Sequence, residues 1–505
     1  MSRTQMLIVG AGPTGLVLAL WLARLGVAVR IVDLTEGPGT TSRALAVHAR
    51  TLELYRQAGL TEAVLAGGHQ VPAVNLWARG ERVAHVGFTG LGEGLTAYPF
   101  LHIFPQDEHE RLLIERLKHA GVEVERRTEL VGFTQGPDGV SARLRGPAGE
   151  ETCEADYVAG CDGARSVVRH TMGAGYPGGT YRQVFYVADV VAGGPAADGE
   201  LHVDLDEADF LAVFPLASDS HVRLIGTVRD ERADHADDLT FEDVSGRAIE
   251  HMRVEVKAVN WFSTYHVHHR VTDRFRQGRA FLLGDAAHIH SPAGGQGMNT
   301  GIGDAINLAW KLASVLRGLA PDSLLDSYEA ERIAFARRLV ATTDRGFSFA
   351  SAEGPVADFL RTRIFPLILK PALAVEPVRE FMFRTVSQIT LNYRGGPLSA
   401  GEAGPVRGGD RLPWVNGADD ETPLSMDWEA RIYGDGPADL APWCAAHGLA
   451  FKAFSFDAAH EAAGLRRAVL YLLRPDTYVA LVAADAGAAT LARFAADRGL
   501  TFGRA

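Results

Sequence analysis

The chain has 505 residues, of which 47% are hydrophobic and 22% charged, which is ordinary for a globular protein of two or three domains. Its formal net charge is −12 at pH 7 and its basic residues form no stripe, which argues against a nucleic-acid partner. Its three cysteines form no CxxC pair, so we expect a reducing, cytoplasmic location. No apolar run reaches the roughly 20 residues that a membrane-spanning helix needs.

The N-terminus has the pattern of a dinucleotide-binding unit. An apolar strand is expected over residues 6–9 and an Ala- and Leu-rich helix over 16–25. Three glycines lie at or between them, namely Gly10, Gly12 and Gly15. The first allows a tight turn, the second lets the backbone approach a pyrophosphate, and the third lets the helix pack on the strand.

A second strand, expected over 27–32, ends in Asp33. This is the place at which the ribose of a dinucleotide needs a carboxylate acceptor, and a second negative charge on a 2′-phosphate would be repelled there. The pattern does not choose among NAD, NADP and FAD. A Gly-rich turn without a ligand is the alternative, which the complete strand–helix–strand context disfavours.

The next elements alternate between helices and strands. We expect a helix over 107–120, a strand over 122–126, a hairpin turn near 137–139 and a strand over 154–160. The last strand runs into Asp162 and Gly163. From residue 176 to 272 strand-like segments dominate, and we expect them to form a sheet.

A third motif follows a short apolar strand over 279–283. Gly284 ends the strand, and Asp285 can accept hydrogen bonds from sugar-like hydroxyl groups. Pro292 fixes a bend, and a Gly-rich run then leads into a helix that extends to residue 316. The free N–H groups of that helix would lie near the ligand and stabilise negative charge.

These three stretches resemble the class A, single-component FAD-dependent aromatic hydroxylases, the family of para-hydroxybenzoate hydroxylase and phenol hydroxylase. In that family the Asp-Gly motif touches FAD and the nicotinamide, and the Gly-Asp motif binds the ribityl chain. The resemblance covers roughly the first 350 residues. It implies an FAD site made by these residues: Gly10, Gly12, Gly15, Asp33, Arg43, Gln106, Asp162, Gly163, Gly284, Asp285, Pro292, Gly295, Gly297, Met298 and Asn299.

The expected fold class is α/β, with three domains. A Rossmann-like FAD-binding domain is expected from residues 1–175 and 273–395, with an inserted β-sheet substrate domain over 176–272. Residues 400–505 resemble the thioredoxin-like domain that larger family members carry, because their predicted hairpin contains a similar Arg474-Pro475-Asp476 turn. This tail lacks CxxC, so we interpret it as a structural or dimer-contact domain.

The resemblance implies a reaction with NADPH or NADH and O2. An FAD C4a-hydroperoxide would hydroxylate a phenolic or polycyclic aromatic substrate. Baeyer–Villiger oxidation or epoxidation on the same scaffold is one alternative, and a non-catalytic flavoprotein that binds a partner is another. The sequence contains neither GxSxG nor HExxH. Substrate identity and nicotinamide preference stay open, and a homodimer is one expected assembly.

A base that helps ionise a phenol is not identified by the sequence. The candidates are His48, His102, His288, His290 and Tyr181, and a structural histidine is the usual alternative for each. His266 and His268 would share one face of a strand while His269 points away. We therefore expect no metal site there.

Overall fold

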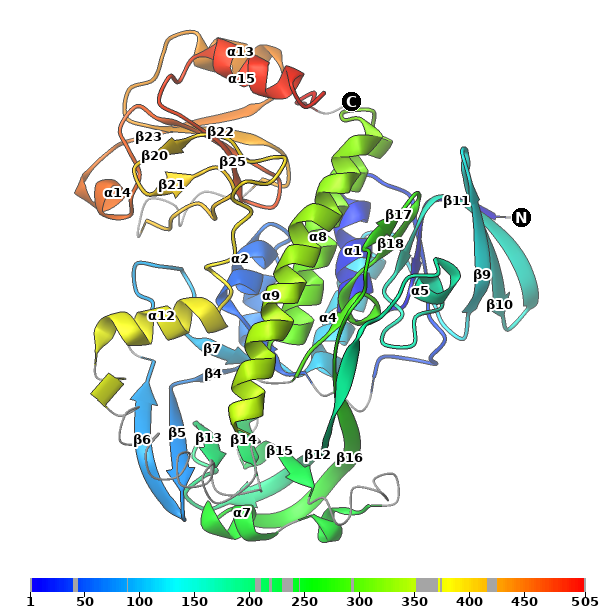
Figure 1. The fold of residues 1–505 in the computed structure, drawn as a ribbon, viewed down its shortest axis with the longest axis vertical. Coiled ribbons are helices and arrows are strands. Elements are labelled where there is room, and N and C mark those ends of the chain that lie inside the picture. Colours follow the sequence, from blue (N-terminus) through cyan, green and yellow to red (C-terminus); the bar gives the residue numbers. More distant parts are fainter. Residues whose placement is uncertain are drawn as a thin grey trace.

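The computed structural model describes most of the chain. The described residues are 2–39, 44–88, 90–204, 210–217, 220–228, 239–244, 246–291, 295–350, 371–372, 375–415 and 425–503, without the side chains of 182 and 343–350. Two long helices run through the middle of the molecule, between a broad sheet at one end and a C-terminal domain at the other (Figure 1). None of the described helices is long and apolar enough to cross a membrane.

The first sheet carries the N-terminal unit. Its strand order is β17-β18-β11-β1-β2-β8, in which β18, β11, β1, β2 and β8 run parallel to one another and β17 is antiparallel to β18. The strands are β1 (Ser2–Val9), β2 (Val29–Val32), β8 (Val124–Glu125), β11 (Gly149–Gly160), β17 (Arg276–Gln277) and β18 (Ala280–Leu282). The hairpin of β9 (Glu129–Gly136) and β10 (Gly139–Gly146) attaches to β11, so the turn expected near 137–139 is confirmed.

Helices cover this sheet. Helix α1 (Pro13–Arg24) is buried over residues 15–22 because nearly every side chain there is apolar, and it packs against α4 (Gln106–His119) and α8 (Gln296–Leu316). Helix α9 (Asp326–Ala350) lies along α8. The other helices here are α2 (Ala49–Arg56), α3 (Thr61–Gly67), α5 (Val167–Thr171) and α12 (Glu376–Val386).

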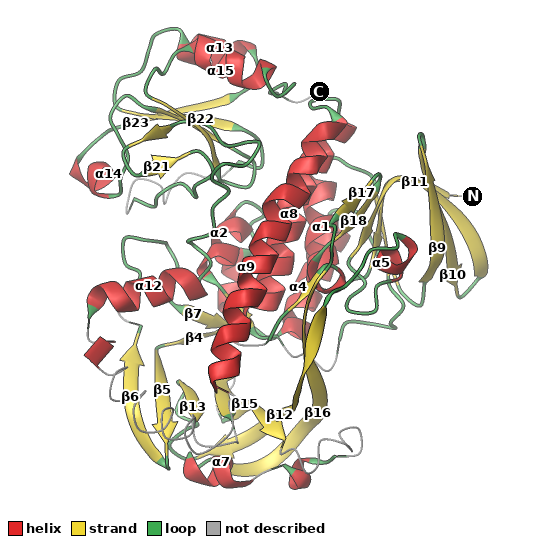
Figure 2. Ribbon diagram, in the orientation of Figure 1, coloured by secondary structure: helices red, strands yellow, loops and turns green. Residues whose placement is uncertain are grey.

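The second sheet has the order β19-β16-β12-β15-β14-β13-β5-β6, and helix α7 (Gly246–His251) covers one face (Figure 2). Its strands are β5 (Ala73–Ala78), β6 (Glu81–Gly87), β12 (Gly178–Gly193), β13 (Leu201–Asp204), β14 (Leu211–Pro215), β15 (His221–Val228), β16 (Glu255–Val271) and β19 (His288–Ile289). Strands β5 and β6 lie outside the predicted insertion 176–272, so this sheet also uses earlier residues.

The two faces of that sheet pack differently. Val184 and Tyr186 belong to a cluster with α7, whereas Phe185 and Val187 pack toward Leu45 and the strands that follow it. Those strands form a three-stranded sheet of β3 (Ala46–Val47), β7 (Leu101–Ile103) and β4 (His69–Val71). The alternation of strand side chains therefore directs one aromatic face toward the first domain.

The C-terminal domain has a four-stranded sheet of order β23-β22-β24-β25, in which only β22 and β23 are parallel. Its elements are β22 (Glu429–Tyr433), α13 (Leu440–Ala446), β23 (Ala450–Phe454), α14 (Ala458–Ala462), β24 (Leu470–Leu473), β25 (Val479–Ala483) and α15 (Ala488–Ala496), after a small hairpin of β20 (Glu402–Ala403) and β21 (Val406–Arg407). The βαβ unit followed by a hairpin and a helix is consistent with the thioredoxin-like prediction. The domain boundaries stay predictions.

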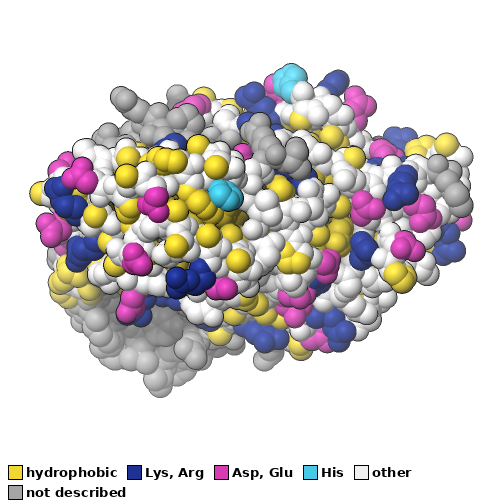
Figure 3. All heavy atoms as spheres, turned by 90° about the horizontal axis from the view of Figure 1, so that it is seen from above, with side chains coloured by type: hydrophobic (Ala, Val, Ile, Leu, Met, Phe, Trp, Pro, Cys, Tyr) yellow, Lys and Arg dark blue, Asp and Glu magenta, His cyan; other side chains and the backbone are white. Residues whose placement is uncertain are grey.

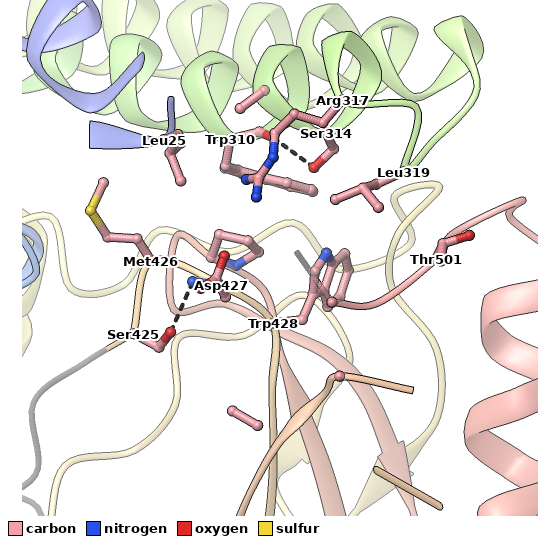
Figure 4. A pocket seen from close by; sticks show the side chains of 15 residues that line it. Leu25, Trp310, Ser314, Arg317, Leu319, Ser425, Met426, Asp427, Trp428 and Thr501 are labelled. Atoms are coloured by element: carbon pink, nitrogen blue, oxygen red, sulfur yellow. Dashed lines mark hydrogen bonds between the residues drawn. The ribbon is translucent and has the colours of Figure 1, made fainter. Parts of the chain in front are cut away.

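This domain rests on the C-terminal half of α8. Trp310 of α8 meets Trp428 edge to face, with ring centroids 5.5 Å apart. Beside them is a pocket of about 240 Å³, and Leu25, Arg317 and Met426 are among the residues that line it (Figure 4). On the face seen in Figure 3, basic and acidic side chains are interspersed rather than gathered by sign.

Candidate functional site

Three sequence motifs meet at one edge of the first sheet. The last residues of its parallel strands form a row, in which Leu282 pairs with Gly160, Gly160 with Val9, and Val9 with Val32. Backbone hydrogen bonds continue this row beyond the strands, for example from Cys161 N to Val9 O at 2.7 Å. Ligands of open parallel sheets bind outside such carboxyl ends.

The glycine loop follows β1 in this row. A side chain at Gly10, whose φ is +102°, would clash with the carbonyl oxygen of Cys161, and one at Gly15 would clash with the carbonyl oxygen of Gly10. Gly12 differs, because no atom lies within 4 Å of the place of a Cβ. Gly12 is also the N-cap of α1 without any side-chain cap. The loop thus offers open space at a helix N-terminus, where a phosphate would be stabilised.

Asp33 closes the loop from the end of β2. Its carboxylate accepts a hydrogen bond from Ala11 N at 2.6 Å and one from Thr35 N at 2.8 Å. Arg126 lies 3.4 Å from the same carboxylate. Asp33 is therefore fixed beside the glycine loop, as its predicted contact with a ribose requires.

Asp162 follows β11 and bonds the first backbone N–H groups of α5, whose N-cap is Ser166. One of its carboxylate oxygens accepts from Val167 N at 2.7 Å and from Val168 N at 3.2 Å. The other oxygen is buried and has no hydrogen-bond partner, and burial raises the pKa of this carboxyl. A buried acceptor without a partner is costly, so this atom fits a ligand that donates a hydrogen bond. Gly163, with a φ of +72°, makes the turn that follows.

The Gly284–His288 turn follows β18. Gly284 has a φ of +55°, and a Cβ there would lie 2.7 Å from Thr14 Oγ1 of the glycine loop. Asp285 is exposed, and its carbonyl oxygen accepts from Tyr176 OH at 2.7 Å. The third motif therefore packs directly against the first, with Asp285 at the surface of the shared edge.

Asp304 of α8 bonds two residues of this turn, Gly284 and His288. Its Oδ2 accepts from Gly284 N at 3.1 Å and lies 2.6 Å from His288 Nε2. Its Oδ1 accepts from Arg332 Nε at 2.6 Å. Burial opposes the charge of Asp304, but Arg332 and His288 outweigh it and lower the pKa. The His288 ring is therefore held in a buried contact with Asp304, which suits a structural role better than that of a free base.

The start of α8 is held against the β3–α2 segment by Asn299. Its side-chain oxygen accepts from His48 N and Thr51 Oγ1, and its side-chain nitrogen donates to Ala46 O and Gly295 O, at 2.7–2.9 Å. All four hydrogen-bonding positions are used, which leaves the Asn299 side chain no capacity for a cofactor. Gly295, with a φ of +62°, is the helix N-cap, and Gly297 and Met298 follow it in the first turn.

Gln106 is the first residue of α4. Its Nε2 donates to Glu110 at 2.8 Å, and its backbone N donates to Ala44 O at 3.0 Å. Gln106 thus lies next to Ala44. Arg43 itself and Pro292 lie outside the described residues, and their predicted contacts stay predictions.

The candidate bases differ in what their side chains touch. Both ring nitrogens of His48 face carbonyl oxygens, those of Val386 and Gly295, and His102 Nε2 bonds Val64 O at 2.8 Å. Tyr181 meets the ring of His269 edge to face at 4.8 Å. His290 differs because its Nδ1 lies 2.8 Å from Ser291 O, while its buried Nε2 has no partner. Burial lowers the pKa of His290 to about 4.

Among the residues that the structure describes, one group has the composition of a metal site, namely Asp198, Glu200 and His202. However, Trp77 Nε1 donates to His202 Nδ1 at 2.9 Å, and His202 Nε2 lies 2.8 Å from Asp198 Oδ1. With Nδ1 accepting, the neutral ring carries its proton on Nε2, so that nitrogen is a donor and not a metal ligand. The prediction that the protein has no metal site stays a prediction.

Comparison with known proteins decides the family. A family model described as an FAD binding domain matches residues 3–343. A relative from Streptomyces rimosus, 6-methylpretetramide 4-monooxygenase, is 37% identical over 404 residues, which cover 79% of this chain and 71% of the relative. The chain belongs to the class A FAD-dependent aromatic hydroxylases. It is an FAD-dependent monooxygenase, and the predicted cofactor FAD is confirmed.

Solved structures of this hydroxylase family confirm the α/β fold over the whole chain. OxyS anhydrotetracycline hydroxylase from Streptomyces rimosus is 29% identical with a TM-score of 0.79, and the similarity covers 100% of both chains. Aklavinone-11 hydroxylase, solved with FAD and aklavinone, is 25% identical with a TM-score of 0.79 and 99% coverage of both chains. The residues around the strand ends fit FAD, since they combine open space at Gly12 with an unpartnered buried acceptor at Asp162.

Sequence reasoning missed the polar residues behind the site. Asp304, Asn307 and Lys311 are buried on α8, and Glu331 and Arg332 are buried on α9. The available signal was their position within apolar helical runs, where a charged side chain needs a partner. The sequence does not show which residues those partners are.

Proposed function

We propose that this hydroxylase adds one oxygen atom from O2 to a polycyclic phenolic substrate, with NADPH or NADH as the electron donor. The observation that carries the proposal is the row of strand ends, which joins Gly12, Asp162 and Asp285 at one edge of the sheet. The polycyclic class is supported by relatives whose names refer to 6-methylpretetramide, anhydrotetracycline and aklavinone. The aromatic inner face of the second sheet supports a flat, apolar substrate.

FAD would supply electron transfer and oxygen activation. In this proposal the backbone at Gly12 and the N-terminus of α1 bind the pyrophosphate, Asp33 accepts from the ribose, and Asp285 accepts from the ribityl chain. The N–H groups of the first turn of α8, at Gly297 and Met298, stabilise negative charge on the flavin ring. The protein's own contribution is therefore binding, orientation and exclusion of water.

His290 is the best-supported of the candidate side chains for contact with a phenol. Its Nε2 is an acceptor, because Nδ1 faces the carbonyl oxygen of Ser291. A pKa of about 4 makes it too weak to remove a phenol proton outright, so we propose that it accepts a hydrogen bond from the hydroxyl group. Replacement of His290 by Ala should lower kcat and alter its pH profile while FAD stays bound; an unchanged profile would contradict this role.

The test of the function is a substrate screen with the purified yellow holoenzyme. Phenols, naphthols and hydroxylated three- and four-ring compounds are supplied, oxidation of NADPH and NADH is followed at matched concentrations, and products are identified by mass and NMR. We expect a polycyclic phenol to stimulate NAD(P)H oxidation and to gain one ring hydroxyl group. Stimulation confined to single-ring phenols would overturn the proposed substrate class.

The same screen separates the alternatives. A ring-expanded ester or an epoxide would support Baeyer–Villiger oxidation or epoxidation. The family assignment already disfavours the non-catalytic alternative, and NAD(P)H oxidation that no aromatic compound stimulates would overturn the proposed aromatic substrate. The proposed cytoplasmic location is supported by three free cysteines. The homodimer stays a prediction, which light scattering of the purified holoenzyme can test.

A further inference from the structure

The turn between β24 and β25, residues 474–478, is the place where the C-terminal domain reaches the charged interior of the first domain. Arg474 is fully buried and bonds both oxygens of Glu331 on α9, at 2.6 and 2.9 Å. It also bonds both oxygens of Asp476, at 2.9 and 2.6 Å. Its guanidinium group thus joins one carboxylate of the first domain to one of its own turn.

Helix α8 supplies the remaining partners. Lys311 Nζ lies 2.8 Å from Glu331, and Trp310 Nε1 donates to Asp476 at 3.1 Å. Two cations, Arg474 and Lys311, are therefore balanced by two anions, Glu331 and Asp476. Buried ions need such partners, and the fixed directions of their hydrogen bonds specify one arrangement of the turn against α8 and α9.

The next residue of α9 links this network to the flavin-binding edge. Arg332 follows Glu331 and points to Asp304, which holds both Gly284 N and His288 Nε2. Arg332 NH1 also donates to Tyr393 OH at 2.9 Å, and the Arg474 guanidinium lies 5.0 Å from the centre of the Tyr393 ring. Arg474 and Asp304 thus bind adjacent residues of α9, namely Glu331 and Arg332.

A second link runs through α2. Arg50 donates to Asp476 O and to Thr477 Oγ1, each at 2.9 Å. Its neighbour Thr51 donates to Asn299 at the start of α8. The turn of the C-terminal domain therefore contacts α2 as well as α9, and α2 in turn contacts the start of α8.

We propose that Arg474 is a positioning residue for the flavin site, and that the C-terminal domain serves as a brace for the Gly284–His288 turn rather than as a redox domain. This inference rests on the proposed binding of FAD at that turn. Arg474 does not touch the site itself. Its bidentate hydrogen bonds to Glu331 fix the position of α9. Arg332, the next residue of α9, bonds Asp304, and Asp304 bonds Gly284 N, so the position of α9 determines the position of this turn.

The test compares FAD affinity with stability in the full chain. Arg474→Met and Arg474→Lys are prepared as apoprotein and titrated with FAD, and the thermal midpoint and visible spectrum of each holoprotein are recorded. We expect Arg474→Met to raise the FAD Kd by between about 5-fold and 150-fold, the usual range for coupled sites. Arg474→Lys should raise it less, since an ammonium group keeps the charge but not the two-pronged contact. If Arg474→Met does not fold, the FAD Kd of Arg474→Lys alone tests the proposal.

Leu491→Ala is the matched control. Leu491 is fully buried in the core of the C-terminal domain, so its truncation destabilises that domain without touching the turn. We expect a lower thermal midpoint with an FAD Kd that changes by less than about twofold. The inference is overturned if both Arg474 variants bind FAD like the wild type, or if Leu491→Ala weakens FAD binding equally. A wild type that binds FAD but oxidises no aromatic compound overturns the proposed function, and the comparison of FAD affinities still decides the inference.

Discussion

Two βαβ units of this protein share a topology and differ in what lies at the strand end. In the first, β1 runs into α1 and pairs with the parallel β2; in the C-terminal domain, β22 runs into α13 and pairs with the parallel β23. At the end of β1, Gly12 faces open space. At the end of β22, a Cβ on Gly434 or Gly436 would meet side chains at 3.0 and 2.8 Å. The loop residues, and not the topology, decide which unit can hold a ligand.

The largest expected effect is at Asp285. Asp285→Ala removes the carboxylate proposed to accept from the ribityl chain, so we expect the purified variant to lack FAD. Flavin absorbance per mole of protein measures this. Asp435→Ala, a change of the same charge on the exposed loop after β22, is the control and should keep its FAD. Full flavin occupancy in Asp285→Ala would show that the ribityl assignment is wrong.

The second effect separates the two kinds of glycine in the N-terminal loop. A methyl group at Gly12 meets no protein atom, so Gly12→Ala should leave the stability of the apoprotein almost unchanged and raise the FAD Kd by about 10-fold or more, which is about 1.4 kcal/mol. Gly15→Ala should instead destabilise the apoprotein, because its methyl group would clash with the carbonyl oxygen of Gly10. Thermal melts and FAD titrations of both variants check this contrast, which equal stability losses would contradict.

The third effect is a loss of stability at low pH, which arises where the C-terminal domain contacts α8 and α9. Burial alone would raise the pKa of Glu331, but the charges of Arg474 and Lys311 outweigh it and lower the pKa to about 2. The stabilisation from ionised Glu331 is therefore present above the ordinary pKa of 4.5 and is lost as the pH falls from 4.5 toward 2. Urea midpoints between pH 6 and pH 3 should fall more steeply for the wild type than for Glu331→Gln. Parallel curves would refute this reading.

The smallest effect concerns the C-terminal unit. Burial raises the pKa of the Cys444 thiol to about 11, and the loop between β22 and α13 contains no cysteine. We expect Cys444→Ala to leave NAD(P)H oxidation unchanged and to cost about 1 kcal/mol or less of stability. Steady-state rates and slow alkylation of the native thiol at pH 8 measure this. A loss of activity with FAD still bound would point to a redox role for the domain.

The sequence by itself determined the family, the cofactor and the order of the motifs. Gly10, Gly12, Gly15 and Asp33 could be interpreted because turn chemistry and helix packing act within some 25 residues of chain. The Asp162-Gly163 and Gly284-Asp285 stretches were identified by resemblance. The fold class followed because each motif comes after an apolar strand.

Tertiary structure decided how those pieces meet and which polar side chains remain available. The row from Leu282 to Val32 joins residues up to 250 positions apart, and β5 and β6 join the second sheet across more than 100 residues. His288 and His290 look alike in the sequence, yet one is paired with Asp304 and the other keeps a nitrogen free. Local patterns report periodicity and turns, whereas the partner of a buried charge is set only when distant helices pack together.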